Sequence, residues 1–505
     1  MPLRSRVRPL ASLACLCGSL AFVAATPLRA QTLSPALRQQ LEEWYHKTTR
    51  HASGDWGIAI GTMDGKVLWS AQPELPLVPA STAKVFTTGF ARTRVGPEAR
   101  KTTRVVGVGR LDSASGVWQG AWSIEVTGDP TFERPDRSGP TLRELAADLA
   151  AHGVRRLEGP LTITSALGPA EARYPAVWEE RYAGKLYAPP IGPVTLHENT
   201  VSFTVRPGAH LGAPPVFVST IPAGAERLVQ VRARTVPGRG SRLVLARRAD
   251  GGWQLLGSVG IGAGTVGFSD VMHDPNIVLD AAWAAALERA GITWERRLPM
   301  ALPAPGAPRT LLAAVYSAPF DSVASEVNRR SLNVGAEMLL LWGAGRHTHP
   351  AELVARHVRE VVGPLAKIHL VDGSGLSELN RVTPLTQMLY LAKMPQRPGQ
   401  QNFPLLLPAN GTGTLRHLRY GMGSGVVHAK TGTLDDAATL TGYLGRADGV
   451  LVVSLMYNGR RTGAARAAQW DLFRLLGADG VSIPAILETQ LGGPQQLGGP
   501  SAGGR

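Results

Sequence analysis

Residues 428–457, HAKTGTLDDAATLTGYLGRADGVLVVSLMY, decide the fold class of this chain. Residues 438–444 and 450–457 are rich in β-branched and aromatic side chains, and Arg446-Ala-Asp-Gly449 between them is a turn signal. The stretch therefore predicts an antiparallel hairpin close to the C-terminal end of the chain.

A second hairpin is predicted near the beginning. Trp56-Gly-Ile-Ala-Ile60 and Val67-Leu-Trp69 flank Met63-Asp-Gly65, and an Asp-Gly pair between apolar runs favours a tight turn. We expect the two hairpins to share one sheet, so that the start and the end of the chain meet.

The residue pattern between these hairpins differs from that of the flanking segments. Residues 98–269 are strand-like and broken by many Gly and Pro turns, whereas helical patterns start at Ser34-Pro35 and resume from about Pro275. The chain of 505 residues is also too long for one core. We therefore predict a mixed α/β (α+β) domain from residues 31–97 and 270–485, interrupted by a largely β insertion at 98–269. Residues 486–505 repeat Gln-Leu-Gly-Gly-Pro and are expected to be a disordered tail.

The first 30 residues indicate export. Basic residues without acids precede an almost wholly apolar run from Leu10 to Ala25, and small residues follow up to Ala30, which is the layout of a secretory signal peptide. The two cysteines, Cys15 and Cys17, lie inside it, so the mature chain has none. No later segment has the ~18 to 20 continuous apolar residues of a membrane span. We expect a periplasmic protein, secreted through the inner membrane, with no transmembrane span.

The charge is basic but spread out. The net charge of +15 comes from 53 basic and 38 acidic residues, and only eight of the basic residues are lysines. The sequence has no dense Lys/Arg run and no basic stripe with interleaved aromatic residues, so we expect an arginine-rich solvated surface rather than nucleic-acid binding.

Ser81-Thr-Ala-Lys84 precedes a helical run. A Ser and a Lys three residues apart face the same side of a helix, so the amine can reach the hydroxyl. Taken alone, the pattern is equally typical of a capping serine followed by a solvated lysine.

Two further elements occur later in the chain. Ser331-Leu-Asn333 lies in a predicted turn between helices, where capping is again the ordinary explanation. Lys430-Thr-Gly432 lies on a predicted strand, where a Gly beside a rare Lys would allow a substrate backbone to come close.

Together the three elements resemble the S-x-x-K, S-x-N and K-T-G signature of the serine penicillin-recognising enzymes. The wider sequence, over most of residues 34–485, resembles the D-alanyl-D-alanine carboxypeptidase/endopeptidase family, the class C low-molecular-mass penicillin-binding proteins of peptidase family S13. That resemblance also rests on five further segments, which are Gly128-Asp-Pro-Thr-Phe132, residues 199–208, residues 327–333, residues 336–339 and Asp372-Gly-Ser-Gly-Leu-Ser377. The family usually has Asp in the middle of the second motif, where this chain has Leu332.

The resemblance implies a penicillin-recognising transpeptidase-like fold and an acyl-enzyme mechanism. Ser81 would attack the carbonyl carbon of the D-Ala-D-Ala bond, and Lys84 would be its base, with a pKa lowered by partial burial and by Lys430. Ser331 would relay a proton to the leaving amine, and Asn333 would hold the substrate amide and position Lys84.

The third motif is implied to hold the substrate. Lys430 and Thr431 would bind the free carboxylate of the peptide, Gly432 would let it approach, and the amides of Ser81 and Thr433 would form the oxyanion hole. The implied partners are peptidoglycan stem peptides, cleaved as D-Ala-D-Ala ends or as D-Ala-meso-diaminopimelate cross-links, and β-lactams, which would acylate Ser81.

No cofactor and no metal are expected. His347, His349 and His357 have no convincing ligand spacing, and Pro350 after His349 favours a helix start. Two alternatives remain open, which are a serine β-lactamase with the same three motifs and a catalytically weak cell-wall binding relative, the latter suggested by Leu332.

Overall fold

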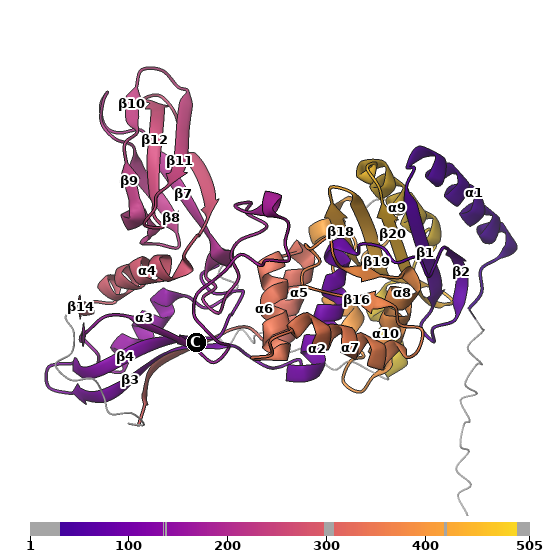
Figure 1. Cartoon of the computed structure of the whole chain (residues 1–505), viewed down its shortest axis with the longest axis horizontal. Helices are drawn as coiled ribbons and strands as arrows, with labels where there is room; N and C mark the ends of the chain where they lie inside the picture. The colour runs from indigo at the N-terminus through magenta and orange to yellow at the C-terminus, as the bar shows by residue number, and fades with distance from the viewer. Residues whose placement is uncertain (1–30, 135, 137–138, 297–307, 419–421, 492–505) are drawn as a thin grey trace, which may run out of the picture.

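The computed structural model describes residues 31–134, 136, 139–296, 308–418 and 422–491. The predicted signal peptide therefore lies outside the described residues. The molecule is elongated, with one body built from the two ends of the chain and another built from its middle (Figure 1).

The first body contains a five-stranded antiparallel sheet in the order β18-β19-β20-β1-β2. Its strands are β1 (Asp55–Thr62), β2 (Val67–Ala71), β18 (Val427–Leu434), β19 (Ala437–Arg446) and β20 (Gly449–Asn458). Strand β1 pairs with β20, with Asp55 opposite Asn458 and Thr62 opposite Leu451. The prediction that the two hairpins share one sheet is confirmed.

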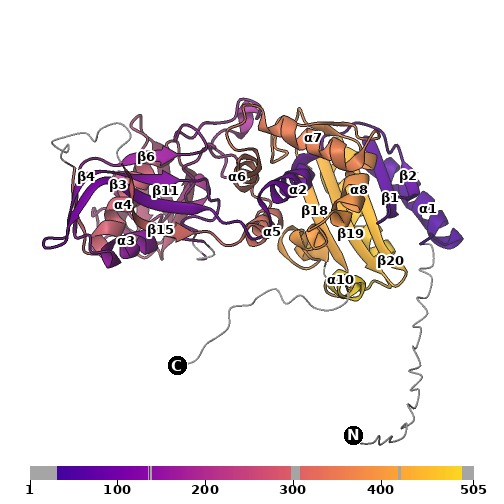
Figure 2. The same ribbon diagram turned by 90° about the horizontal axis from the view of Figure 1, so that it is seen from below.

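Helices cover both faces of this sheet (Figure 2). One face packs on α1 (Pro35–His51) and α9 (Thr462–Leu476), and the other packs on α8 (Pro384–Lys393), with α2 (Lys84–Val95), α7 (Pro350–Val362) and α10 (Ile483–Leu491) in the same core. The alternation of β1 explains the arrangement, since Trp56, Ile58 and Ile60 belong to the first core and Ala59 to the second. Gly57 lets α8 approach closely, because a Cβ there would lie 2.6 Å from Cγ of Pro384.

Helix α10 corrects one prediction. It begins at Ile483 and runs to Leu491, and Ile483 and Leu487 are buried in the core on the α8 face. The first six residues of the predicted disordered tail are therefore helical. The rest of that tail lies outside the described residues.

The second body has a core of its own. Its main sheet has the order β14-β5-β4-β3-β15, with β6 beside β4, and it packs on α3 (Leu142–Ala151) and α4 (Pro275–Arg289). The strands are β3 (Thr102–Asp112), β4 (Val117–Val126), β5 (Arg156–Glu158), β6 (Thr162–Ser165), β14 (Thr293–Glu295) and β15 (Thr310–Tyr316).

A smaller β region projects from this second body and forms the upper left of Figure 1. It contains the sheet β13-β7-β8 and the sheet β10-β12-β11 with β9 beside β12. The strands are β7 (Thr200–Arg206), β8 (Val216–Ile221), β9 (Val229–Val231), β10 (Arg234–Val236), β11 (Ser241–Arg247), β12 (Trp253–Gly260) and β13 (Val266–Val271).

The predicted end of the insertion at residue 269 is too early. Helix α4 packs in the core of the second body, and β15 pairs with β3 from Thr310 opposite Gly107 to Tyr316 opposite Thr102. The chain therefore returns to the first body only after Tyr316. The helical pattern after Pro275 was correct, but amphipathicity does not reveal which core a helix joins.

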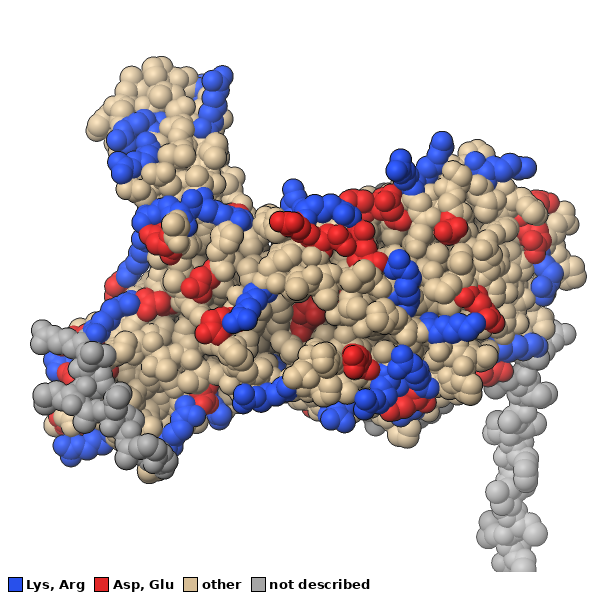
Figure 3. Space-filling view, in the orientation of Figure 1, with Lys and Arg blue, Asp and Glu red and all other residues tan. Residues whose placement is uncertain are grey.

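Two helices lie where the bodies meet, namely α5 (Phe320–Arg330) and α6 (Asn333–Ala344), and both pack against α2 (Figure 1). On the face shown in Figure 3, basic and acidic side chains are interspersed. Within the described residues, no helix is both long and apolar enough to span a bilayer.

Candidate active site

Ser81 lies in a single 3-10 turn (η1, Ala80–Ala83) that leads directly into α2. Apolar side chains of α2, among them Phe86 and Phe90, are buried against α7 and α8, which fixes the helix start. Lys84, the first residue of α2, is completely buried, and its Nζ lies 2.9 Å from Oγ of Ser81. The first predicted motif is therefore an assembled Ser/Lys pair and not a solvated lysine.

Lys84 is held by two further acceptors. Its Nζ donates to Oδ1 of Asn333 and to the carbonyl oxygen of Ser374, both at 2.6 Å. Burial lowers the pKa of Lys84 to about 7, against the opposing effect of the carboxylates of Asp372 and Glu337. Of the two causes predicted from the sequence, burial is the main one, whereas the charges that act on the pKa of Lys84 are acidic and do not include Lys430.

The second motif lies between α5 and α6. Ser331 ends α5 in the left-handed conformation (φ 61°), and Asn333 is the first residue of α6. Asn333 bridges two parts of the molecule, since its Oδ1 accepts from Lys84 and its Nδ2 donates to the carbonyl oxygen of Tyr187 at 2.8 Å.

Leu332, the unusual middle residue of this motif, packs against a small apolar cluster that contains Val327 and Leu339. Its neighbours Ser331 and Asn333 keep their contacts with the two lysines. An apolar middle residue is therefore compatible with an assembled motif.

The third motif lies on β18, an edge strand of the five-stranded sheet. Lys430 is buried, and its Nζ donates to Oγ of Ser331 at 2.8 Å and to the carbonyl oxygen of Thr431 at 2.7 Å. Burial, followed by the charges of Lys84 and Arg466, holds the pKa of Lys430 well below its ordinary value.

Gly432 allows β18 to lie against the turn that carries Ser81. A Cβ at this position would lie 2.8 Å from the backbone nitrogen of Ser81 and 2.3 Å from Oγ1 of Thr439. A side chain would therefore push the strand away from the serine.

These motifs border a cavity of about 520 Å³. Four predicted residues line it, namely Ser81, Ser331, Asn333 and Thr433. The remaining lining residues were not predicted, and they are Tyr182, Tyr187, Leu376, Leu434, Asp435 and Thr462. All eight predicted site residues line this cavity or lie directly beside it. The lining includes side chains from both bodies.

Sequence reasoning missed several groups that hold the site together. Asp372 accepts hydrogen bonds from the amides of Gly375 and Ser377 at 2.8 Å, and from Nε1 of Trp178 at 3.0 Å. Glu337 accepts from the amide of Ser374 at 2.8 Å, and burial raises its pKa to about 7. Both carboxylates lie in segments that carried the family resemblance, which was the only signal for them.

Arg466 of α9 was also missed. It is half-buried, and its Nη2 donates to Oγ1 of Thr433 at 3.0 Å while its Nη1 donates to the carbonyl oxygen of Thr439 at 2.8 Å. The guanidinium thus ties β18 to β19 beside the third motif. No pattern around residue 466 distinguished it from the many surface arginines of this chain.

The chain is similar over most of its length to known carboxypeptidases. It is 28% identical over 439 residues to a D-alanyl-D-alanine carboxypeptidase of an Actinomadura species, covering 82% of this chain and 79% of that one. It is 28% identical over 403 residues to carboxypeptidase Rv3627c of Mycobacterium tuberculosis, covering 77% of this chain and 72% of that one.

The fold is similar to that of penicillin binding protein 4 of Haemophilus influenzae, with a TM-score of 0.66 and 19% sequence identity over 85% of this chain and 99% of that chain. The model of the D-Ala-D-Ala carboxypeptidase 3 (S13) family matches residues 37–476. The fold class and the family inferred from the three motifs are thereby confirmed. This protein is a serine peptidase that belongs to the D-Ala-D-Ala carboxypeptidase 3 (S13) family.

Proposed function

We propose that Ser81 is the nucleophile that cleaves the D-Ala-D-Ala bond of peptidoglycan stem peptides through an acyl-enzyme. The observation that carries this proposal is the Lys84 amine, buried 2.9 Å from Oγ of Ser81 with a pKa of about 7. A substantial fraction of Lys84 is therefore neutral near pH 7 and able to accept the serine proton.

In the first step Oγ of Ser81 bonds to the carbonyl carbon while its proton moves to Nζ of Lys84. The backbone amides of Ser81 and Thr433 stabilise the oxyanion, which the closeness of Gly432 to the nitrogen of Ser81 supports. The C–N bond then breaks, and the leaving D-Ala amine takes a proton through Ser331. Water hydrolyses the ester and restores the free serine.

Lys430 and Thr431 bind the terminal carboxylate of the peptide. The buried amine of Lys430, which contacts Ser331 on the cavity wall, supports this role because it can donate a hydrogen bond to a carboxylate. Asn333 holds the substrate amide and keeps Lys84 directed at Ser81, as its 2.6 Å contact with Lys84 supports.

β-Lactams acylate the same serine, and the cross-links between D-Ala and meso-diaminopimelate are a second class of substrate. The protein acts in the periplasm after removal of residues 1–30. These statements rest on the sequence motifs and on the pattern of the N-terminal segment.

The test is covalent labelling with a fluorescent penicillin. We expect a label that lasts for many minutes on the native protein and is absent from Ser81→Ala, with Ser241→Ala on exposed β11 as the matched control. A label that disappears quickly indicates the β-lactamase alternative, and no label on the native protein indicates the catalytically weak relative.

Digestion of purified peptidoglycan, followed by mass analysis, distinguishes the two peptidase activities. Loss of one D-Ala from monomers shows carboxypeptidase action, and conversion of dimers to monomers shows endopeptidase action. A label that survives Ser81→Ala contradicts the assignment of the nucleophile.

A further inference from the structure

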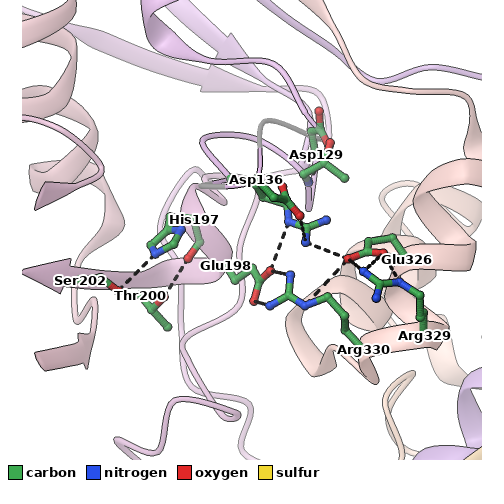
Figure 4. A network of polar contacts seen from close by, with 11 residues as sticks. Asp129, Asp136, His197, Glu198, Thr200, Ser202, Glu326, Arg329 and Arg330 are labelled. Carbon is green, nitrogen blue, oxygen red and sulfur yellow. Dashed lines mark hydrogen bonds and ion pairs between the residues drawn. The ribbon is translucent and has the colours of Figure 1, made fainter. Parts of the chain in front are cut away.

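Four charged side chains form a ring between the second body and the last turn of α5, directly before Ser331. Arg134 and Glu198 come from the second body, and Glu326 and Arg330 come from α5; Figure 4 shows the last three with their dashed contacts. Nη2 of Arg134 lies 2.8 Å from Oε1 of Glu326, and Nε of Arg134 lies 3.5 Å from Oε1 of Glu198.

Arg330 closes the ring. Its two terminal nitrogens contact both carboxylate oxygens of Glu198, the Nη2–Oε2 distance being 3.1 Å, and its Nε lies 3.9 Å from Oε1 of Glu326. The charges alternate around the ring, so each guanidinium faces both ring carboxylates, and Nη2 of Arg134 also lies 2.9 Å from Oδ2 of Asp136. A two-pronged arginine–carboxylate contact of this kind fixes orientation as well as distance.

Three members of the ring are shielded from water. The side chain of Arg134 is 2% exposed and those of Glu198 and Glu326 are each 17% exposed, while that of Arg330 is 35% exposed. Charge pairs at such sites are screened less by solvent and salt than pairs on an open surface. The ring is therefore a fixed connection and not a loose surface contact.

The backbone that presents Glu198 is itself held in place. His197, Glu198 and Asn199 all have positive φ (46°, 59° and 56°), a conformation that is unfavourable for residues other than glycine and persists only when the surroundings enforce it. The side chain of Asn199 supplies part of that enforcement, because it accepts from the amide of Leu196 at 3.2 Å and donates to the carbonyl oxygen of Pro190 at 2.9 Å.

The ring also affects the second motif, because it fixes the last turn of α5. Ser331 follows Arg330 directly and also has a positive φ of 61°, so its hydroxyl is placed by the end of α5. That hydroxyl accepts from Nζ of Lys430 at 2.8 Å. A shift of the last turn of α5 would move the hydroxyl relative to both Lys430 and the leaving amine.

We propose that Glu198 and Arg330, within the Arg134–Glu198–Arg330–Glu326 ring, are positioning residues that hold Ser331 in place for proton transfer to the leaving group. This inference rests on the proposed function, because it assigns the ring a role through Ser331. It also gives the second body a part in catalysis, since both ends of the second motif are tied to it, Ser331 through Glu198 and Asn333 through Tyr187.

The experiment compares Glu198→Gln and Arg330→Gln in the full chain, with a D-Ala-D-Ala-terminated peptide as substrate. We expect kcat to fall about tenfold, since displacement of a reacting group by about 1 Å costs up to 10²-fold, while KM changes less than about twofold. Arg329→Gln is the matched control, because Arg329 pairs with Glu326 but takes no part in the ring, and it should keep kcat within about twofold. Equal losses in Arg329→Gln and Arg330→Gln overturn the proposal.

A second measurement separates positioning from general loosening. The rate of acylation by a fluorescent penicillin is measured for Glu198→Gln alone and in the Ser331→Ala background. If Glu198 acts through Ser331, its substitution has no further effect in that background, whereas an additional tenfold loss overturns the proposal. Glu198→Asp, which keeps the charge, should recover part of the acylation rate. If Glu198→Gln does not fold, the same comparison is made with Arg330→Gln alone.

The outcome also separates this inference from the proposed function. If Ser81→Ala still becomes labelled, or Ser331→Ala acylates at the native rate, the proposed function fails. If both of these variants are impaired while Glu198→Gln and Arg330→Gln are not, only the positioning role fails.

Discussion

Nζ of Lys430 donates a 2.8 Å hydrogen bond to Oγ of Ser331, and the two residues are 99 positions apart in the sequence. The Lys84–Ser81 pair makes the same kind of contact within the turn at the start of α2, whereas Lys430 lies on a strand and Ser331 in the turn between α5 and α6. Both lysines are buried, and the positive charge of Lys84 opposes charging of Lys430. The site therefore contains two serine–lysine pairs, and their protonation should govern its activity.

The rate of acylation should rise with pH through about 7. Lys84 is protonated below its pKa of about 7 and cannot accept the proton of Ser81, whereas above that pH it is neutral and can. The measurement is kcat/KM for a D-Ala-D-Ala peptide between about pH 5 and pH 9, as bell-shaped or sigmoidal profiles report the pKa of the free enzyme.

Lys84→Arg is the companion variant for this profile. A guanidinium stays charged in this range, so the variant should lose activity at every pH instead of shifting the profile. A native rate that is constant between pH 5 and pH 9 contradicts the role of Lys84 as base.

Glu337→Gln should shift the acylation profile toward lower pH. The carboxylate of Glu337 raises the pKa of Lys84, so its removal lets Lys84 become neutral at a lower pH. Gln retains an oxygen that can accept from the amide of Ser374, which limits structural change. Glu352→Gln, at an exposed position on α7, is the control and should leave the profile where it is. An upward shift in Glu337→Gln would be inconsistent with this account.

Lys430→Met should weaken recognition of the substrate carboxylate. We expect KM for a D-Ala-D-Ala peptide to increase about tenfold or more, in line with the loss of a charged hydrogen bond of ~1.5 to 3 kcal/mol. The same peptide with an amidated C-terminus lacks the carboxylate and should show a much smaller change. Lys367→Met, at an exposed ion pair with Glu74, is the control. Equal losses for the free and amidated peptides would argue against carboxylate binding by Lys430.

Gly432→Ala should disable the site while leaving most of the fold intact. The new Cβ would lie 2.8 Å from the nitrogen of Ser81 and 2.3 Å from Oγ1 of Thr439, so β18 must move away. We expect acylation to slow by about 10²-fold through this displacement. Overpacking of this kind costs ~1 to 3 kcal/mol of folding stability, which thermal unfolding measures. Gly240→Ala is the control, because no atom lies within 4 Å of its new Cβ. Acylation of Gly432→Ala at the native rate would show that β18 does not need to lie this close to Ser81.

The sequence was most informative where local patterns determine structure. The apolar and β-branched runs at residues 56–60 and 450–457, together with the Asp-Gly turns, were sufficient to predict strands that pair in one sheet. The three motifs were predicted as a set, and the structure brings Ser81 and Asn333 within hydrogen-bonding distance of Lys84, and Ser331 within hydrogen-bonding distance of Lys430. Short motifs carry this information because the chemistry requires those side chains.

Long-range packing was not readable in the same way. The pattern after Pro275 predicted a helix, but only the contacts of α4 and β15 reveal that this segment completes the second core. Tyr182 and Tyr187 line the cavity although more than 100 positions separate them from Ser81, and nothing in their local sequence points to the cavity. The left-handed backbone at Ser331 and at residues 197–199 is equally invisible, because none of these positions is occupied by glycine.

The pairing of Thr102 with Tyr316 means that the polypeptide leaves the peptidase body and comes back to it at almost the same point. An inserted segment whose two ends are neighbours can be lengthened or exchanged during evolution without separating the helices that flank it. This explains how Lys84 and Asn333 can stand 249 positions apart and still meet at 2.6 Å. Any segment that replaced the second body would, however, have to supply its own partners for Arg330 and Asn333. This requirement limits the insertions that the enzyme can accept.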